Sequence, residues 1–441
     1  MPKADTIFAL STPRGKSGVA VIRISGPASL DAIRNMGVKG EIEPRMAHCK
    51  TLYDRKGIPI DYAVILYFPG PNSFTGEDVV ELQVHGSNAV IRLIFEELQG
   101  FIRIAEPGEF SLRAFLNGKI DLTRAEGIAD LINAETEAQL RQALAQTSGK
   151  LEALYKNWRN AVISVISRLE ACIDFPEDIS SDVLLGIHHE IEELHKMLKE
   201  HINDENRGER LKNGARVVIL GAPNAGKSTL FNFIAQREIA ITSEYPGTTR
   251  DMLEVCVDIG GYPFIFVDTA GIRESSDFVE CEGIKRAKLA AQEADIKVVM
   301  VPYGEIESFD FNILEKLHDE NTIYVLSKAD DAKYDILEIK GKSFCLLSVH
   351  NNLGVNNLLA QISEKSKESF PKHGDVLITS QRHRGHVQNA IKNILEINEE
   401  MPVEIIAEYL RLAAKELGAI TGAVHVDDIL SSIFGKFCVG K

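Results

Sequence analysis

The sequence predicts a multidomain protein of α/β and all-helical parts, in which a domain with a mostly parallel sheet interrupts a helical one. Three observations predict this class. Short strand-like runs separated by turn signals fill residues 5–118. Apolar residues at helical spacing follow them and return near the C-terminus. Between the two helical stretches, from Arg216 onward, strand and helix patterns alternate.

The N-terminal part is expected to be an α/β domain. Its clearest strand is residues 79–85, where apolar and polar residues alternate. We therefore expect one apolar face, and one polar face that carries Glu81, Gln83 and His85.

The helical part is predicted in two pieces. Residues 140–169 fit a single helix about 45 Å long. A second helix, residues 185–201, ends in a polar stretch at 203–213, and helical spacing returns at 387–395 and 403–417. Since neither piece closes a core alone, we expect them to pack as one domain around an inserted domain. The predicted domains are residues 1–118, 119–212, 213–372 and 373–441.

Composition excludes several classes of protein. A net charge of -15 argues against non-specific coating of nucleic acid. The six cysteines include no C-x-x-C pair, so neither a zinc module nor a disulfide framework is expected. The longest apolar runs are too short for a membrane span, and the N-terminus lacks the long apolar region of a signal peptide. We expect a cytoplasmic protein without a membrane partner.

Residues 221–228 read G-A-P-N-A-G-K-S, which is a phosphate-binding loop. Gly221 and Gly226 let successive backbone N–H groups curl around phosphate oxygens at a helix N-terminus. Lys227 would reach the β- and γ-phosphates, and the Ser228 hydroxyl would ligate Mg²⁺.

Two further segments fit the γ-phosphate and its Mg²⁺. The run D-T-A-G at 268–271 follows a strand pattern, so that Asp268 supports the metal and the N–H of Gly271 meets the phosphate. Thr248 and Thr249 lie in P-G-T-T-R-D, where a switch threonine closes over the Mg²⁺; we assign that role to Thr249.

Guanine recognition is predicted at two later loops. Asp330, in the run S-K-A-D, can accept two hydrogen bonds from guanine that adenine does not offer. Ser327 occupies a position where Asn is usual, and we expect this shorter side chain to weaken nucleotide affinity. The residues expected to contact GTP are Asn224, Ala225, Gly226, Lys227, Ser228, Thr229, Ser243, Thr248, Thr249, Asp268, Thr269, Ala270, Gly271, Ser327, Lys328, Ala329, Asp330, Ser348, Val349 and His350.

Several longer motifs resemble a known family, the tRNA-modifying GTPases called MnmE or TrmE. They are D-T-I-F-A-L-S-T-P-R-G (5–15), R-I-S-G-P (23–27), P-N-S-F-T-G-E-D (71–78), P-G-E-F-S-L-R-A-F-L-N-G-K (107–119), A-E-G-I-A-D-L-I (125–132), G-T-T-R-D (247–251) and F-C-V-G-K (437–441). The resemblance implies an N-terminal tetrahydrofolate-binding domain, a central helical domain, and a Ras-like G domain inserted into the latter.

The resemblance also implies a folate site and a tRNA-modification residue. Matched positions for a reduced folate, such as 5-formyltetrahydrofolate, are Arg23, Glu81, Lys119 and Lys441. A carboxylate such as Glu81 can pair with the donor edge of a pterin, and cations suit the glutamyl tail. Cys438 matches a C-terminal cysteine that the family needs for tRNA modification.

In the G domain the resemblance implies activation by K⁺ and by G-domain dimerisation. A monovalent cation beside the phosphates would neutralise developing charge as an arginine does. Glu280 matches the residue that orients water, with Glu282 as a rival, and Lys227 acts with it in catalysis. The positions that match the K⁺ ligands are Asn224, Ser243, Tyr245 and Thr248.

The implied partners are a second copy of the chain, tRNA and the FAD- and NADH-dependent flavoprotein MnmG in a heterotetramer, so FAD enters only through that partner. The implied reaction adds an aminomethyl or carboxymethylaminomethyl group to carbon 5 of the wobble uridine. Two alternatives remain: a regulatory or ribosome-assembly GTPase without modification chemistry, and a folate-dependent transferase with a vestigial G domain. The basic run at 382–386 fits either a local tRNA contact or charge balance.

Overall fold

In the computed structural model the chain divides into two compact units, each described here by itself. Unit 1 is Met1–Ala129, Thr147–Asn160 and Ala414–Lys441, and unit 2 is Asp130–Gln146 and Ala161–Ala413. The structure describes the chain except residues 1–4, 175–180, 205, 238–239, 242–252, 269–289, 308, 310–317, 332–335, 372–376, 399, 425–429, 431–432, 436, 438–439 and 441.

Unit 1 contains a six-stranded sheet in the order β3-β4-β5-β2-β1-β6. Neighbouring strands are antiparallel except β1 and β6, which are parallel. Its strands are β1 (Ile7–Leu10), β2 (Ser17–Ser25), β3 (His48–Tyr53), β4 (Pro59–Phe68), β5 (Val79–Gly86) and β6 (Arg103–Ile104).

Helices cover one face of this sheet. Helices α1 (Ser29–Asn35) and α2 (Asn88–Leu98) pack on it, and the apolar residues of β5 at positions 80, 82 and 84 are buried there. The alternation predicted for residues 79–85 is confirmed: Glu81 and Gln83 are half-buried, and His85 is exposed. The other helices of this part, α3 (Glu109–Leu116) and α4 (Leu122–Ile132), follow the sheet in the chain.

The prediction of one helix over residues 140–169 is wrong. The structure has two helices there, α5 (Glu137–Thr147) and α6 (Lys150–Asp174). They are separated at Gly149, whose φ of 85° lies in the left-handed region that favours glycine. A Cβ at that position would come within 2.1 Å of the Arg124 guanidinium, so a side chain does not fit.

The next helix begins four residues before the predicted residue 185, and the polar stretch after it contains a further helix. Helix α7 spans Ser181–Ile202, but the polar stretch that follows is not irregular throughout. It contains the short helix α8 (Arg207–Asn213), in which Leu211 is buried although most neighbours are polar. One buried residue per turn is too little apolar periodicity to be recognised from sequence.

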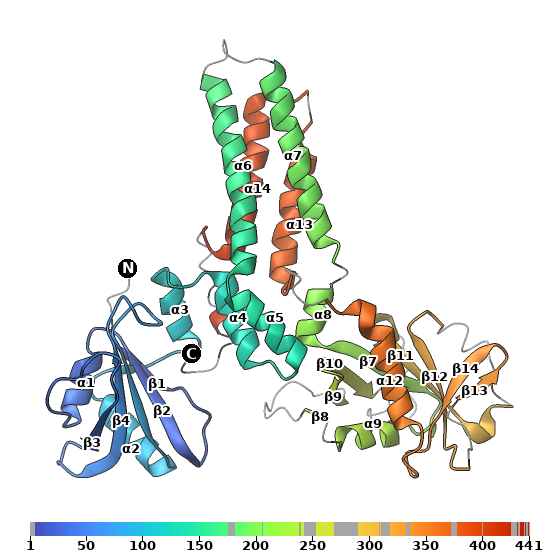
Figure 1. Ribbon diagram of the computed structural model, residues 1–441, viewed down its shortest axis with the longest axis horizontal. Coiled ribbons are helices and arrows are strands. Elements are labelled where there is room, and N and C mark those ends of the chain that lie inside the picture. Colours follow the sequence, from blue (N-terminus) through green and yellow to red (C-terminus); the bar gives the residue numbers. More distant parts are fainter. Residues whose placement is uncertain are drawn as a thin grey trace, which may run out of the picture. The chain divides into compact units, whose positions relative to one another are not determined.

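The helices after the G domain return to those before it. Helix α13 (Gln381–Leu395) packs against α7, and Arg411 of α14 (Val403–Thr421) is paired with Glu170 of α6 at 2.9 Å. Figure 1 shows these four long helices running side by side. Helical sequence on both sides of the G domain therefore forms one bundle, which confirms the predicted insertion; the exact domain boundaries stay a prediction.

Unit 2 also contains an eight-stranded sheet in the order β13-β14-β12-β11-β7-β10-β9-β8. The central pairings, from β14 through β12, β11 and β7 to β10, are parallel, and β8, β9 and β13 pair antiparallel at the two edges. Its strands are β7 (Ala215–Gly221), β8 (Ala240–Ile241), β9 (Leu253–Ile259), β10 (Tyr262–Asp268), β11 (Ile296–Pro302), β12 (Thr322–Ser327), β13 (Ile336–Ile339) and β14 (Lys342–Leu346).

Two helices cover one face of this sheet. Helix α9 (Lys227–Ala235) and helix α12 (Val355–Ser366) bury their apolar residues in the same core as Val217 and Ile219 of β7. The carboxyl ends of the parallel strands meet at one edge of such a sheet, which is where ligands bind in open α/β folds. The phosphate loop and the two base loops all begin there.

Candidate functional sites

The phosphate loop follows β7 and turns into α9. Gly226 is the N-cap of α9 in a left-handed conformation, and among the described residues no side chain caps this helix. The first N–H groups of α9 are therefore oriented for an anion. Gly221 is constrained by space, because a Cβ there would lie 2.5 Å from the Met300 carbonyl oxygen.

Lys227 and Asp268 supply the buried charges of this site. Nζ of Lys227 donates to the carbonyl oxygens of Gly221 at 3.0 Å and Ala222 at 2.9 Å. Burial lowers the pKa of Lys227, and the negative charge of Asp268 opposes that shift. Asp268 ends β10, is only 1% exposed, and lies beside β7 in register with Ile219. Ser228, the second residue of α9, is exposed.

The two predicted base loops contact each other. The hydroxyl of Ser348 donates to Oδ1 of Asp330 at 2.5 Å, and the Asn351 amide donates to the Asp330 carbonyl oxygen at 3.0 Å. The N–H of Ala329 also bonds to the carbonyl oxygen of Leu347 at 3.1 Å. These contacts join the loop after β12 to the loop after β14 and hold the Asp330 side chain between them. Its role in guanine recognition stays a prediction.

Ser327 has a structural contact that the sequence did not suggest. Its hydroxyl donates to the carbonyl oxygen of Ala225, inside the phosphate loop, at 2.6 Å, and the residue is 2% exposed. A hydrogen bond thus joins the base loop to the phosphate loop. The expectation that Ser327 weakens nucleotide affinity stays a prediction, but this serine does support the loop.

Some predicted nucleotide and tRNA-modification residues lie outside the described residues. Nothing is said of their structure, and their assignments stay predictions. They are Ser243, Tyr245, Thr248, Thr249, Thr269, Ala270, Gly271, Glu280 and its rival Glu282, Cys438 and Lys441.

In unit 1 the structure brings Arg23 and Glu81 together. They are opposite each other on β2 and β5, and the Nε and Nη2 atoms of Arg23 lie 2.9 and 2.8 Å from Oε1 of Glu81. Among the described residues, Oε2 of Glu81 makes no hydrogen bond. Both side chains are partly exposed, so this carboxylate oxygen is available to the N–H edge of a ligand.

Lys119 is held at the loop that joins β4 and β5. Its Nζ donates to the carbonyl oxygen of Pro71 at 2.8 Å. Aromatic neighbours of Arg23 were missed at the sequence level: the guanidinium carbon lies 5.9 Å from the ring centre of Phe74 and 5.8 Å from that of Phe110. Both rings lie within quoted motifs, 71–78 and 107–119, but those motifs did not assign a role to either ring.

Comparison with known proteins agrees with this architecture. The family description "MnmE helical domain" matches residues 122–438, and "GTP-binding protein TrmE N-terminus" matches residues 6–119. The chain belongs to the MnmE family of tRNA modification GTPases. The MnmE relative from Anaplasma marginale is 64% identical across 100% of both chains. The MnmE relative from Wolbachia sp. subsp. Drosophila simulans is 54% identical across 99% of both.

The similarity to one solved structure is much weaker. The G domain of the T. maritima FeoB iron transporter matches 35% of this chain and 99% of its own at 22% identity, with a TM-score of 0.26. We draw no argument from a similarity this low. The family matches confirm three predictions from the sequence: the family, the fold class, and the enzyme class, which is a GTP hydrolase.

The basic run at 382–386 is partly explained by ion pairs within this MnmE-family chain. Arg384 donates to Asp204 at 2.7 Å and to Glu209 at 2.8 Å, and His383 is fully buried. These two residues therefore favour the charge-balance interpretation over a tRNA contact. Within the part of the chain that the structure describes, we find no helix with the length and apolar character of a membrane span.

Proposed function

We propose that this chain is a K⁺-dependent GTPase that acts with MnmG to add an aminomethyl or carboxymethylaminomethyl group to carbon 5 of the wobble uridine of certain tRNAs. The observation that carries the proposal is the presence of two different sites in one chain of this family. A phosphate loop with Lys227 and Asp268 lies at the carboxyl edge of one sheet, and the Arg23–Glu81 pair lies on another.

The described part of the nucleotide site fits GTP and Mg²⁺. The open N–H groups at the start of α9 suit phosphate oxygens, and the Ser228 hydroxyl begins the same turn. Ser228 and Thr249 would ligate Mg²⁺, with Asp268 supporting it, and Asp330 would accept the guanine N–H groups. Mg²⁺ would neutralise phosphate charge during transfer to water. Lys227 and Glu280 would stabilise the phosphates and orient the water.

K⁺ activation depends on Asn224. This residue is exposed within the phosphate loop and has a φ of 64°, a left-handed conformation that Asn tolerates. Its amide oxygen is a suitable ligand for a monovalent cation, completed by Ser243, Tyr245 and Thr248. We expect KCl to raise GTP hydrolysis at least tenfold over NaCl, since one charge-stabilising contact in a transition state contributes about 10²–10³ to kcat. Equal rates in the two salts would argue against K⁺ dependence.

The folate part of the proposal uses Arg23, Glu81 and Lys119, with Lys441 and Cys438 near the end of the chain. The open Oε2 of Glu81 suits the donor edge of a pterin, and Lys119 suits an anionic tail. A reduced folate such as 5-formyltetrahydrofolate would provide the one-carbon unit. The partners would be a second copy of the chain, tRNA, and MnmG, which would bring FAD and NADH, in the cytoplasm.

The test is mass spectrometry of tRNA nucleosides from cells that lack the protein. Loss of the modified wobble uridine, restored by the wild-type chain but not by Lys227→Ala or Glu81→Gln, is the expected result. Modification that persists in the deletion strain would instead favour a regulatory or ribosome-assembly GTPase. A chain that modifies tRNA without hydrolysing GTP would favour the folate-dependent transferase.

A further inference from the structure

Residues 70–78, in the loop that joins β4 and β5, are held by side chains from the segment that follows α3. The Asn117 amide donates to the carbonyl oxygen of Thr75 at 2.7 Å, and Lys119 donates to that of Pro71 at 2.8 Å. We call residues 70–78 the β4–β5 loop. Two bonds from outside it restrain its backbone at separate points.

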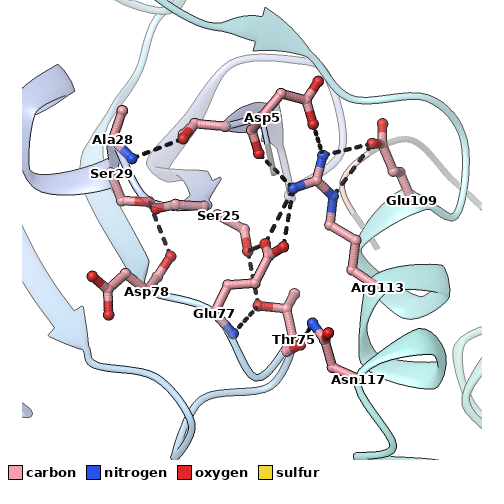
Figure 2. Close-up of polar contacts among 12 residues, drawn as sticks. Asp5, Ser25, Ala28, Ser29, Thr75, Glu77, Asp78, Glu109, Arg113 and Asn117 are labelled. Atoms are coloured by element: carbon pink, nitrogen blue, oxygen red, sulfur yellow. Dashed lines mark hydrogen bonds and ion pairs between the residues drawn. The ribbon is translucent and has the colours of Figure 1, made fainter. Parts of the chain in front are cut away.

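A cluster of Arg113 with Asp5, Glu77 and Glu109, which we call the arginine cluster, holds the same loop (Figure 2). Arg113 is 11% exposed; it donates to both carboxylate oxygens of Glu77 at 3.2 Å, and it also contacts Asp5 and Glu109. Glu77 in turn accepts a bond of 2.7 Å from the hydroxyl of Ser25 on β2. The loop is therefore joined to α3 and to the strand that carries Arg23, so its shape is set before any ligand binds.

The restrained β4–β5 loop presents an aromatic ring, Phe74, beside Arg23 of the Arg23–Glu81 pair. Phe74 is 39% exposed, whereas Phe110, the other ring near Arg23, is fully buried. The guanidinium carbon of Arg23 lies 5.9 Å from the ring centre of Phe74, within cation–π range, yet Phe74 keeps 39% of its surface exposed, so part of the ring stays open to a ligand. Phe74 and Glu81 are both neighbours of Arg23, and among the described residues Oε2 of Glu81 makes no hydrogen bond. A restrained, exposed ring and an available carboxylate oxygen around one arginine suit a flat heterocycle with N–H donors.

We propose that Phe74 is a specificity-determining residue of the folate site, on which the flat pyrimidinone half of a reduced pterin stacks while Glu81 accepts its N–H groups. The inference rests on the folate part of the proposed function. Each residue recognises a different feature of the ligand. The Glu81 carboxylate selects for N–H donors on the edge of the pterin, and the Phe74 ring selects for a flat ring system. Stacking depends on the aromatic face, so a side chain that is merely apolar does not replace it.

The experiment is isothermal titration of the full-length protein with 5-formyltetrahydrofolate. We expect Phe74→Leu to weaken binding about tenfold, the scale of one ring stacked on a nucleobase. Phe74→Tyr keeps the aromatic face and should stay within about twofold to threefold of wild type. The matched control is Phe101→Leu, because Phe101 is also an exposed ring of unit 1 with an arginine, Arg55, 5.4 Å from its centre. This control should bind like wild type.

The possible outcomes distinguish failure of the Phe74 stacking role from failure of the proposed folate site. If Glu81→Gln loses affinity while Phe74→Leu binds like wild type, the stacking role is wrong and the folate site stands. If both Phe74→Leu and Phe74→Tyr lose affinity equally, packing rather than stacking is at work and the inference fails. If the wild-type protein does not bind the folate, the folate proposal fails first and the inference with it. Thermal melting of each variant checks that it is folded.

Discussion

Lys227 and Arg23 are the central cations of the two candidate sites, and their surroundings differ. Lys227 is held by two backbone carbonyl oxygens of its own loop, only five and six residues away. Arg23 is held by a carboxylate 58 residues away on another strand. The candidate nucleotide site is thus shaped mainly by local backbone, whereas the proposed folate site is shaped by side chains from distant segments. This difference predicts that mutations will damage the two sites in different ways.

The largest expected effect is on catalysis at the backbone-shaped site. Lys227→Ala should lower kcat for GTP hydrolysis about 10³-fold, because a preorganised charge facing the phosphates is lost. The loop geometry should survive, since glycines and the N-terminus of α9 maintain it, and the melting temperature should stay near wild type. The exposed Lys367→Ala is the control in the same hydrolysis assay. A Lys227→Ala protein that unfolds would contradict the backbone-shaped description.

At the site shaped by side chains, we expect a mutation to lower stability rather than catalysis alone. Among the described residues, Arg113→Leu leaves Glu77 without a cation and Glu109 with Arg103 alone, which should cost about 3 kcal/mol of local stability. Hydrogen exchange of the β5 amides should be correspondingly faster. Arg34→Leu, which removes an exposed pair with Asp31, should cost less than about 1 kcal/mol. Equal exchange in the two variants would argue that the cluster does not support unit 1.

The base specificity of the nucleotide site is tested by comparing GTP with xanthosine triphosphate. Asp330→Asn should weaken GTP binding roughly 30-fold to 100-fold, since an acceptor for two guanine N–H groups becomes a mixed donor and acceptor. Xanthosine triphosphate should gain affinity in the same variant. Competition binding with both nucleotides measures the switch. An unchanged preference would mean that Asp330 does not face the base.

The Ser327 contact predicts a smaller effect. Ser327→Ala removes the hydrogen bond to the Ala225 carbonyl oxygen, and a buried neutral bond of this kind contributes about 1 kcal/mol. GTP affinity should therefore fall roughly fivefold in equilibrium binding. Ser327→Asn, with a longer side chain, should bind more tightly than wild type if the serine is a weak substitute. Tighter binding by Ser327→Ala would contradict the bridging role.

The smallest expected effect is a pH dependence of the arginine cluster. The hydrogen bond from Arg103 lowers the pKa of Asp5. Burial raises the pKa of Glu109, but bonds from Arg103, from the Glu106 N–H and from Arg113 outweigh it and leave it lowered. Folded-state values below the ordinary 3.8 and 4.5 mean that the stability is present above those values and is lost as pH falls through the lower ones.

Comparing wild type with an Asp5→Asn, Glu109→Gln double variant isolates this contribution. The wild-type protein should melt at the higher temperature at pH 6, and the difference should shrink as the pH falls below about 4. A difference that stays constant from pH 6 to pH 3 would show that the two carboxylates do not provide this stability.

The sequence by itself determined the features that depend on contiguous residues. The phosphate loop, the Asp330 loop and the alternation of β5 each follow from local spacing, because backbone conformation and strand periodicity are local properties. The insertion also followed from sequence, since the helical pattern stops and returns. The break at Gly149 was missed because the crowding by Arg124 that it avoids comes from another helix.

Tertiary structure alone decided which distant side chains meet. Strand pairing placed Arg23 opposite Glu81, and the fold of the β4–β5 loop placed Phe74 beside Arg23. The bond from Ser327 to Ala225 joins residues 102 positions apart, so no local pattern could reveal it. Such contacts depend on register and packing, which are fixed only when the whole sheet forms.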